Sequence, residues 1–195
     1  MTELRTFIEA FLMALLILLF LATVIFLSFT LWSMTELPEG PFNPFITVTG
    51  LTVALLGLYG IIRVYTVFPP HVMLSRTIKT LPWEVVSLFQ TRDRGECKGN
   101  IKIVVEGPYS CVRHPLYSSV TLFFLGLSFI KAPLLITTAT LFIAYRLLGY
   151  IEERYLNQVT CGEYEKAMKG IPSINPLLMM LCILKDLANK LRRRA

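Results

Sequence analysis

Gly107-Pro-Tyr-Ser-Cys-Val-Arg-His-Pro-Leu-Tyr117 is the stretch from which the rest of the chain can be interpreted, because a polar, basic segment meets an apolar one here. Gly107-Pro108 is a turn signal, and Pro115 suits the first turn of a helix, where its missing amide hydrogen costs least. A helix N-terminus attracts anions and carbonyl oxygens. The stretch therefore predicts a pocket wall, formed by Tyr109, Arg113, His114 and Tyr117.

The composition indicates a membrane protein. The chain has 195 residues, of which 54% are hydrophobic, and its mean hydropathy is +0.61, which is too apolar for a soluble domain of this size. The formal charge of +6 is concentrated in particular loops, and basic residues do not alternate with aromatic ones. We therefore interpret the charge as orientation in a membrane and expect no nucleic-acid partner.

The four cysteines do not predict a metal site. They show neither CxxC spacing nor a pairing with histidines that would bind zinc. Three of them fall on the side of the membrane that we predict to be cytoplasmic, so we expect reduced thiols. The cysteines are Cys97, Cys111, Cys161 and Cys182.

Apolar segments predict the helices. Residues 7–32 are longer than a signal-peptide core and predict a retained transmembrane helix. Residues 45–68 predict a second span, in which Gly50, Gly57 and Gly60 allow close helix approach and Arg63 extends to the headgroups. Residues 116–130 and 133–150 are separated only by Lys131-Ala132, so they predict a tight hairpin whose second helix continues through Leu156.

The last apolar segment, residues 176–184, is too short to span a membrane. Nine helical residues reach about 14 Å, under half of a hydrocarbon core of about 30 Å. We expect a partial or surface-seated fifth helix, although a fifth crossing that continues through residues 185–190 is the alternative. The predicted fold is an all-α integral membrane protein with about five transmembrane or membrane-seated helices, a helical hairpin and a cytoplasm-facing C-terminal catalytic subdomain.

Loop charges orient this fold. The loops near residues 36 and 131 are poor in Lys and Arg, whereas residues 71–115 and the C-terminal part are rich in them. By the positive-inside rule, both termini and the Gly107 segment face the cytoplasm. We divide the chain into an N-terminal pair of transmembrane helices (1–68), a cytoplasmic or interfacial connection with a short surface helix at 81–90 (69–100), and a cofactor-binding catalytic subdomain (101–195).

The helix predicted at 133–156 carries the ionisable residues. Arg146 lies in an apolar stretch, where an ionisable group is a functional candidate by default, and Glu153 shares its helix face seven residues later. A structural ion pair or extension toward the headgroups is the alternative for Arg146. Glu152 and Glu153 point about 100° apart on a helix, so we do not expect them to act as a close pair on one substrate. A solvated helix face is their alternative.

Several short motifs, in this order, resemble the isoprenylcysteine carboxyl methyltransferase family in a short prokaryotic form, which is related to phospholipid methyltransferases. The resemblance covers roughly residues 101–176, and the first two spans carry no family signal. The chain departs from the family pattern at Gly162-Glu-Tyr164, which is one residue short. The motifs are Gly107-Pro-Tyr109, Arg113-His-Pro-Leu-Tyr117, Glu152-Glu-Arg-Tyr-Leu156, Gly162-Glu-Tyr164, and Ile171-Pro172 with Pro176.

The resemblance implies an integral membrane enzyme like the protein-S-isoprenylcysteine O-methyltransferases, which transfer a methyl group from S-adenosylmethionine to a lipid-linked or prenylated acceptor. It also implies a catalytic pair, Arg146 and Glu153, in which Arg146 meets the acceptor carboxylate. The implied cofactor-binding residues are Ile101, Lys102, Ile103, Val104, Tyr109, Arg113, His114, Pro115, Leu116, Tyr117, Glu152 and Glu153.

This chemistry is physically consistent with the residues present. A methyl sulfonium needs no metal, so alignment and the exclusion of water can drive the reaction. An ionised acceptor carboxylate needs no general base, and Arg146 can orient it through two parallel hydrogen bonds. We expect the acceptor to enter from the bilayer among the membrane lipids and the cofactor to enter from the cytoplasm.

Three other interpretations stay open on the sequence alone. A phospholipid N-methyltransferase would need a base to deprotonate its ammonium acceptor, and none is obvious in the membrane-embedded part. An NADPH-dependent sterol-type reductase shares an RHPxY-like motif, but such enzymes are much longer. The last alternative is a non-catalytic membrane protein in which the polar motif is a structural clamp.

Overall fold

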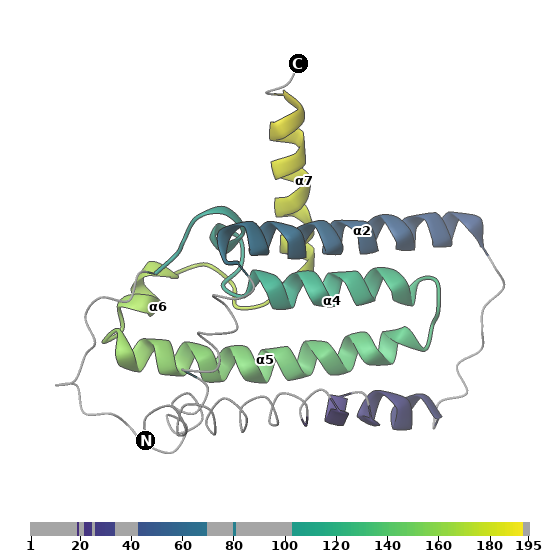
Figure 1. Ribbon diagram of the computed structural model, residues 1–195, viewed down its shortest axis with the longest axis horizontal. Helices are drawn as coiled ribbons and strands as arrows, with labels where there is room; N and C mark the ends of the chain where they lie inside the picture. The colour runs from purple at the N-terminus through teal and green to yellow at the C-terminus, as the bar shows by residue number, and fades with distance from the viewer. Residues whose placement is uncertain are drawn as a thin grey trace, which may run out of the picture.

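The computed structural model describes residues 19, 22–24, 26–33, 43–69, 80 and 103–192, and these contain no strand. Three helices run side by side along one direction: α2 (Pro44–Val67), α4 (Pro115–Ser128) and α5 (Leu134–Val159) (Figure 1). Three further elements are η1 (Gly107–Ser110), α6 (Glu163–Ala167) and α7 (Pro176–Arg192). α2 and α5 are long and apolar enough to cross a membrane. The predicted all-α membrane fold is confirmed.

Local sequence signals set the ends of α2. The Asn43 side chain accepts hydrogen bonds from the amides of Phe45, at 3.0 Å, and Ile46, at 3.4 Å, which satisfies two donors at the helix start. Phe68 is extended, as expected for a residue that precedes Pro69. The predicted span at 45–68 is therefore confirmed to within one residue at each end.

The hairpin of α4 and α5 is also confirmed. α4 has 14 residues and lies between α2 and α5, while α5 continues for 26 residues without a break. α4 falls short of the length that would cross a bilayer, as its sequence indicated. Its N-terminal end, where His114 leads into Pro115, lies beside the C-terminal half of α5. That arrangement brings the two principal sequence motifs to the same end of the hairpin.

α2 and α4 pack closely because small residues line their contact. A Cβ atom on Gly57 would lie 2.5 Å from the backbone nitrogen of Phe123, and one on Gly60 would lie 2.5 Å from the Ser119 hydroxyl oxygen. The atom on Gly57 would force the two helices apart, and the atom on Gly60 would displace the Ser119 side chain. The prediction that these glycines allow close approach is confirmed.

α7 packs against the N-terminal half of α4. Val112, Leu122, Met179 and Ile183 form a buried apolar cluster that connects α4 with α7. The predicted fifth helix exists and extends as one element to Arg192. Arg63 was expected only to extend to the headgroups; its Nε atom lies 3.1 Å from the Asp186 carboxylate of α7.

The expectation of reduced thiols is wrong for the three cysteines that the structure describes, because Cys111, Cys161 and Cys182 are all disulfide-bonded. Cys111 and Cys182 form a disulfide across a sequence separation of 71 residues, with their Cα atoms 6.3 Å apart. Sequence spacing does not show this pairing, because α7 brings Cys182 to the end of η1 only when it packs on α4. The disulfide fastens the loop before Arg113 to α7.

Two predictions fall largely or wholly outside the described residues. Of the span predicted at 7–32, residues 19, 22–24 and 26–32 are described and helical. Val24 packs in a small apolar cluster with Leu141 and Ala144 of α5. The surface helix predicted at 81–90 lies outside the described residues.

Candidate active site

The Arg113-His114 dipeptide is held in place by the segment that precedes α7. The Arg113 amide donates to the Pro172 carbonyl at 2.9 Å, and the His114 amide donates to the Ser173 carbonyl at 3.0 Å. The Arg113 side chain reinforces this pairing, because its Nε donates to the Ile171 carbonyl at 2.7 Å. The predicted Ile171-Pro172 motif thus supports the main site motif.

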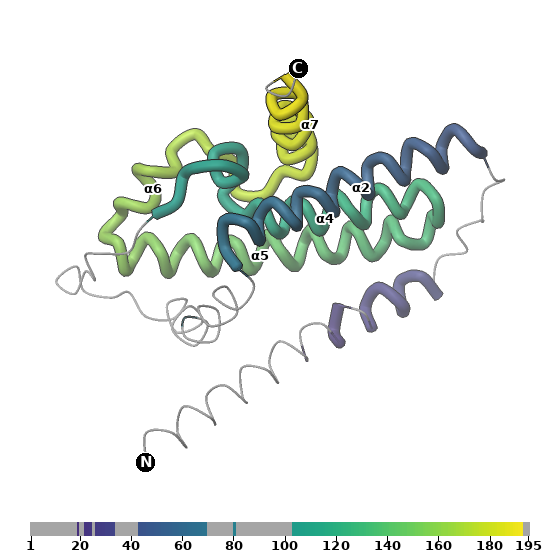
Figure 2. The backbone as a smooth tube through the Cα atoms, turned by 45° about the horizontal axis from the view of Figure 1, so that its top comes forward, coloured from purple at the N-terminus to yellow at the C-terminus, as the bar shows by residue number. Residues whose placement is uncertain are grey.

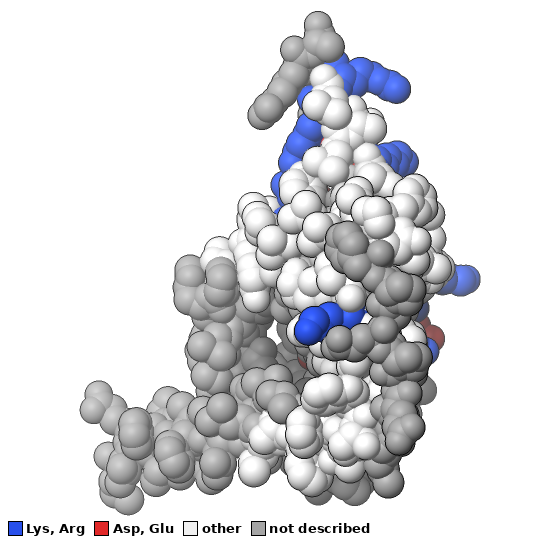
Figure 3. Space-filling model, turned by 90° about the vertical axis from the view of Figure 1, so that its right-hand side faces the viewer, with Lys and Arg blue, Asp and Glu red and all other residues white. Residues whose placement is uncertain are grey.

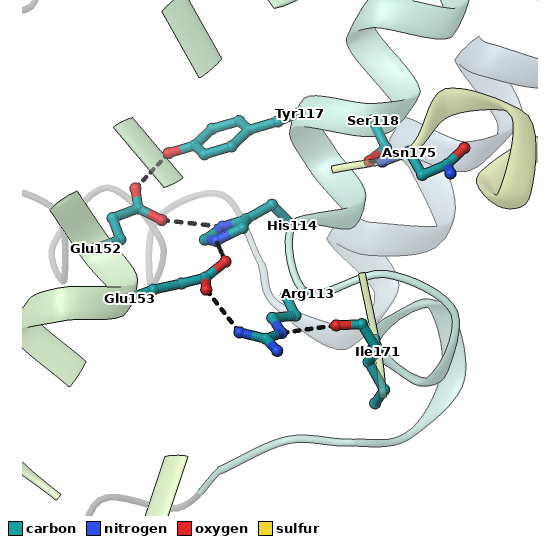
Figure 4. A network of polar contacts seen from close by, with 8 residues as sticks. All are labelled: Arg113, His114, Tyr117, Ser118, Glu152, Glu153, Ile171 and Asn175. Carbon is teal, nitrogen blue, oxygen red and sulfur yellow. Dashed lines mark hydrogen bonds and ion pairs between the residues drawn. The ribbon is translucent and has the colours of Figure 1, made fainter. Parts of the chain in front are cut away.

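His114 lies between the two acids of α5 (Figure 4). Its Nδ1 atom is 3.2 Å from a Glu152 carboxylate oxygen, and its Nε2 atom is 3.1 Å from a Glu153 carboxylate oxygen. The two acids point in different directions, as predicted, and both reach the same protein side chain; that they do not act as a close pair on one substrate stays a prediction. The imidazole fills the space between them, so each carboxylate meets one ring nitrogen.

Two further contacts complete this network, which we call the His114 cluster: Arg113, His114, Tyr117, Glu152 and Glu153. Arg113 donates to Glu153 at 2.7 Å, in an ion pair whose two side chains are each less than one-fifth exposed. The Tyr117 hydroxyl donates to Glu152. With His114 protonated, two cations and two carboxylates balance each other, which makes their partial burial tolerable.

His114 is protonated at neutral pH. Only 8% of its surface is exposed. Burial disfavours the charged ring, but the hydrogen bonds and negative charges of Glu152 and Glu153 outweigh it and raise the pKa of His114 from 6.5 to about 9. With both nitrogens carrying hydrogens, the ring donates to both carboxylates.

Two residues of α5 that the sequence analysis did not single out complete the site wall. The Tyr145 ring stacks on Tyr117 at 4.6 Å between centroids, and Tyr117 stacks on His114 at 5.4 Å. Gly149 lies against the imidazole, since a Cβ atom there would be 3.1 Å from the His114 Cδ2 atom. The spacing of Tyr145, Gly149 and Glu153, four residues apart, is the helical signal that could have identified this face.

Other predicted residues lie around the His114 cluster. The Tyr109 ring meets Phe68 edge to face at 5.6 Å, at the end of α2. Tyr164, from the Gly162-Glu-Tyr164 motif, is buried, and its burial together with the negative charge of Glu153 raises the pKa of its hydroxyl. Pro115 and Leu116 form the first turn of α4, with Pro115 buried.

The predicted backbone segment at 101–104 is described only in part. Ile103 and Val104 are half-buried and have no regular secondary structure, while Ile101 and Lys102 lie outside the described residues.

Arg146 is not brought into the His114 cluster. It is exposed on α5, whereas Glu153, predicted to share its face, is turned toward His114 and Arg113. The residues of α5 that meet the His114 cluster, Tyr145 and Gly149, share one helix face, and both lie to the same side of Arg146 around the helix axis. Arg146 therefore lies at the edge of the site face, where it is accessible from outside the helix bundle.

The cluster combines groups that suit a small zwitterionic ligand. Two carboxylates can meet an ammonium group or ribose hydroxyls, a guanidinium can meet a carboxylate, and stacked rings can meet a flat base. The described residues contain no group of His, Cys, Asp and Glu that could hold a metal ion.

Comparison with known proteins identifies the family. A sequence profile described as phospholipid methyltransferase matches residues 48–160, more than half of the chain. Neither a curated protein nor a solved structure shows a match. The profile includes most of α2, so the expectation that the first two spans carry no family signal is wrong for the second one. It also favours methyl transfer over reduction by NADPH. The chain belongs to the phospholipid methyltransferase family and is a membrane methyltransferase.

Proposed function

We propose that this protein transfers a methyl group from S-adenosylmethionine to the carboxylate of a prenylcysteine-like or other lipid-linked acceptor at the membrane surface. The observation that carries the proposal is the convergence of Arg113, His114, Glu152 and Glu153 at the end of the α4–α5 hairpin. These residues come from two of the five sequence motifs that carry the family resemblance. The family match supports the methyltransferase part of the proposal independently.

The residues present fit the cofactor. When bound, S-adenosylmethionine supplies an electrophilic methyl group on a sulfonium centre. Glu152 and Glu153 would hold its ammonium group or ribose hydroxyls, while Arg113 and His114 would hold its carboxylate. Tyr109, Tyr117 and the backbone of residues 101–104 would line the adenosine part.

The protonated His114, which donates to both carboxylates of the cluster, favours an acceptor that is already an anion. A carboxylate needs no deprotonation before it attacks a methyl group, so the site has only to orient it and exclude water. The exposed Arg146 on α5 can meet such a carboxylate with two hydrogen bonds. We propose that the lipid tail approaches α5 from the bilayer and that the cofactor enters from the cytoplasmic side of a multi-pass protein.

A phospholipid amine is the second candidate, favoured by the description of the matching family. Amine methylation requires a base, because an ammonium group has no free electron pair. Glu152 and Glu153 already accept hydrogen bonds from His114, and Glu153 also pairs with Arg113. Burial of Glu153 is outweighed by its interactions with His114, Ser173 and Arg113, which lower the pKa of this carboxyl group to about 2, so Glu153 is a weak base and the site favours the carboxylate acceptor.

The stability of the product to alkali separates the two candidates. We would supply methyl-labelled S-adenosylmethionine to the full chain in nanodiscs, with either a prenylcysteine or phosphatidylethanolamine as acceptor. A methyl ester releases volatile methanol in mild alkali, whereas an N-methyl group does not. We expect label on the prenylcysteine, released by alkali. Alkali-stable label on phosphatidylethanolamine alone would establish the second candidate instead.

Variants at Arg146 test how the acceptor is held. Arg146→Gln should raise the KM for the acceptor by about tenfold or more, the loss expected for a charge-assisted hydrogen bond of about 1.5–3 kcal/mol, without changing cofactor affinity. Arg146→Lys keeps the charge and should recover part of the loss. An unchanged acceptor KM in Arg146→Gln would remove this residue from the proposal.

A further inference from the structure

The orientation of α7 differs from that of every other long helix. In Figure 1, α2, α4 and α5 run along one direction and α7 projects across them, and Figure 2 shows the same crossing from a second angle. α2 and α5 have the length of membrane spans. If their common direction follows the bilayer normal, α7 lies along the plane of the membrane.

Contacts with α2 set the depth of α7. Asp186 accepts a hydrogen bond from the Tyr59 hydroxyl at 3.0 Å and pairs with Arg63 at 3.1 Å. Arg63 lies four residues before the end of α2 at Val67, which is about 6 Å along a helix axis. Helices that lie in the membrane interface place their apolar face about 5–10 Å into the boundary between headgroups and acyl chains. The depth of α7 agrees with that position.

One face of α7 is apolar and exposed. The residues of this leucine stripe recur at intervals of four and three, so they share a helix face. The opposite side of α7 carries Met179 and Ile183, which are buried against α4. The leucines of the stripe are 44–69% exposed, so none of the described segments covers this face as α4 covers the opposite one. The leucine stripe consists of Leu177, Leu181, Leu184, Ala188 and Leu191.

Charge indicates what covers the stripe. The described helix carries three basic residues and one acidic residue, Asp186, which gives it a formal charge of +2. Figure 3 shows basic side chains gathered along the projecting part of α7. Lys185 and Arg192 flank the stripe and are exposed. A two-fold contact with a second copy would bring these cations together, whereas anionic headgroups complement them.

We propose that α7 is an interfacial helix that binds anionic phospholipids of the leaflet nearest the His114 cluster. The leucine stripe enters the acyl boundary, and Lys185 and Arg192 reach lipid phosphates from its flank. The Asn175 amide, just before α7, donates to the Ser118 hydroxyl of α4 at 3.2 Å. Lipid binding by α7 therefore steadies the start of α4, where the site motif lies.

Spin labels on the full chain test this proposal without any activity measurement. We would attach a single nitroxide to each of three separate variants. Leu184→Cys and Leu191→Cys place the label on the leucine stripe, and Asn189→Cys, on another face of α7, is the matched control. The chain would be placed in nanodiscs of phosphatidylcholine, with or without phosphatidylglycerol. Molecular oxygen partitions into acyl chains, whereas a nickel chelate stays in water, so the ratio of their collision rates with the label reports its depth.

With phosphatidylglycerol present, we expect a ratio severalfold higher at both leucine positions than at Asn189. Adding Lys185→Gln and Arg192→Gln should remove the part of this difference that depends on phosphatidylglycerol, with the thermal unfolding temperature unchanged. Equal ratios at all three positions would overturn the proposal. A ratio that is indifferent to phosphatidylglycerol would overturn the anionic-lipid assignment, and spin–spin broadening between labels would show that a second copy covers the stripe.

Discussion

At the scale of single residues, His114 determines the electrostatics of the site. It separates two carboxylates that neighbour each other in the sequence and neutralises them together with Arg113. The stacked Tyr117 ring limits movement of the imidazole on one side. A ligand with its own ammonium and carboxylate groups can exchange partners with these residues without leaving a buried charge unpaired.

The raised pKa of His114 predicts how stability depends on pH. Because the folded state holds this proton more tightly than the unfolded state, the stabilisation is complete below pH 6.5 and is lost as pH rises through about 9. The difference amounts to on the order of 3 kcal/mol. Thermal unfolding of wild type and His114→Gln across this range should show a stability gap that closes toward high pH. A gap that stays constant would contradict the assigned proton.

Part of this site could be predicted from the sequence. The polar residues at the start of α4 and the acidic pair on α5 belong to motifs with recognisable order, and the structure brings them together. Tyr145 and Gly149 were missed, because an aromatic residue and a glycine in an apolar helix have no distinctive local signal. Their role depends on which face of α5 meets α4, and local patterns do not fix that.

At the scale of elements, α5 can pack closely against His114 because Gly149 has no side chain at the point of contact. The imidazole of His114 occupies the space that a side chain would fill there. The nearby residues Tyr145 and Glu153 reach past this gap to contact Tyr117 and Arg113. The glycine thus allows one helix to present an aromatic ring and an acid to the same neighbour.

Gly149→Ala should disturb the site without unfolding the helix. The added Cβ atom would lie 3.1 Å from the imidazole, so the ring must shift by a few tenths of an ångström. Alanine favours the helix by about 1 kcal/mol, which offsets part of the crowding. We expect a severalfold weaker affinity for S-adenosylmethionine by calorimetry at a nearly unchanged unfolding temperature. Leu147→Ala, at an exposed position of the same helix, serves as the control and should bind normally.

The helices themselves were largely predictable, and their exceptions have physical causes. The positions of α2, α4 and α5 could be predicted from hydropathy, because each is a long apolar segment. α6 was not predicted, since five residues with mixed polarity show no periodicity. Side chains that precede it satisfy two amides of its first turn: Thr160 Oγ1 accepts from the Tyr164 amide, and Asn157 Oδ1 accepts from the Glu165 amide.

At the scale of the whole molecule, α7 and the disulfide join the site to the rest of the fold. Cys111 and Cys182 connect the loop before Arg113 to α7, and the Arg63–Asp186 pair connects α7 to α2. The direction of α7 could not be predicted, because it depends on contacts between segments far apart in the sequence, such as the Tyr59–Asp186 hydrogen bond across 127 residues and the disulfide across 71. These contacts support the site motif from the side opposite α5.

The disulfide should contribute measurably to stability. Closing a loop of 71 residues restricts the unfolded chain and stabilises the folded state by about 4 kcal/mol. Replacing both residues, as Cys111→Ser with Cys182→Ser, should lower the unfolding temperature measured without reductant. Reductant should lower it further, because Cys161 is disulfide-bonded as well. A double variant as stable as the oxidised wild type would contradict this contribution.

Calorimetric titration with S-adenosylmethionine tests the central claim, that the Arg-His motif and the acidic pair of α5 enclose one nucleoside-bearing donor. The wild type should bind it and give no heat with NADPH. Glu153→Gln should bind about tenfold to a hundredfold more weakly, as expected for losing a charged hydrogen bond, while Glu163→Gln, at a pair exposed on α6, should bind normally. Wild-type affinity in a folded Glu153→Gln variant, or heat from NADPH alone, would contradict the account.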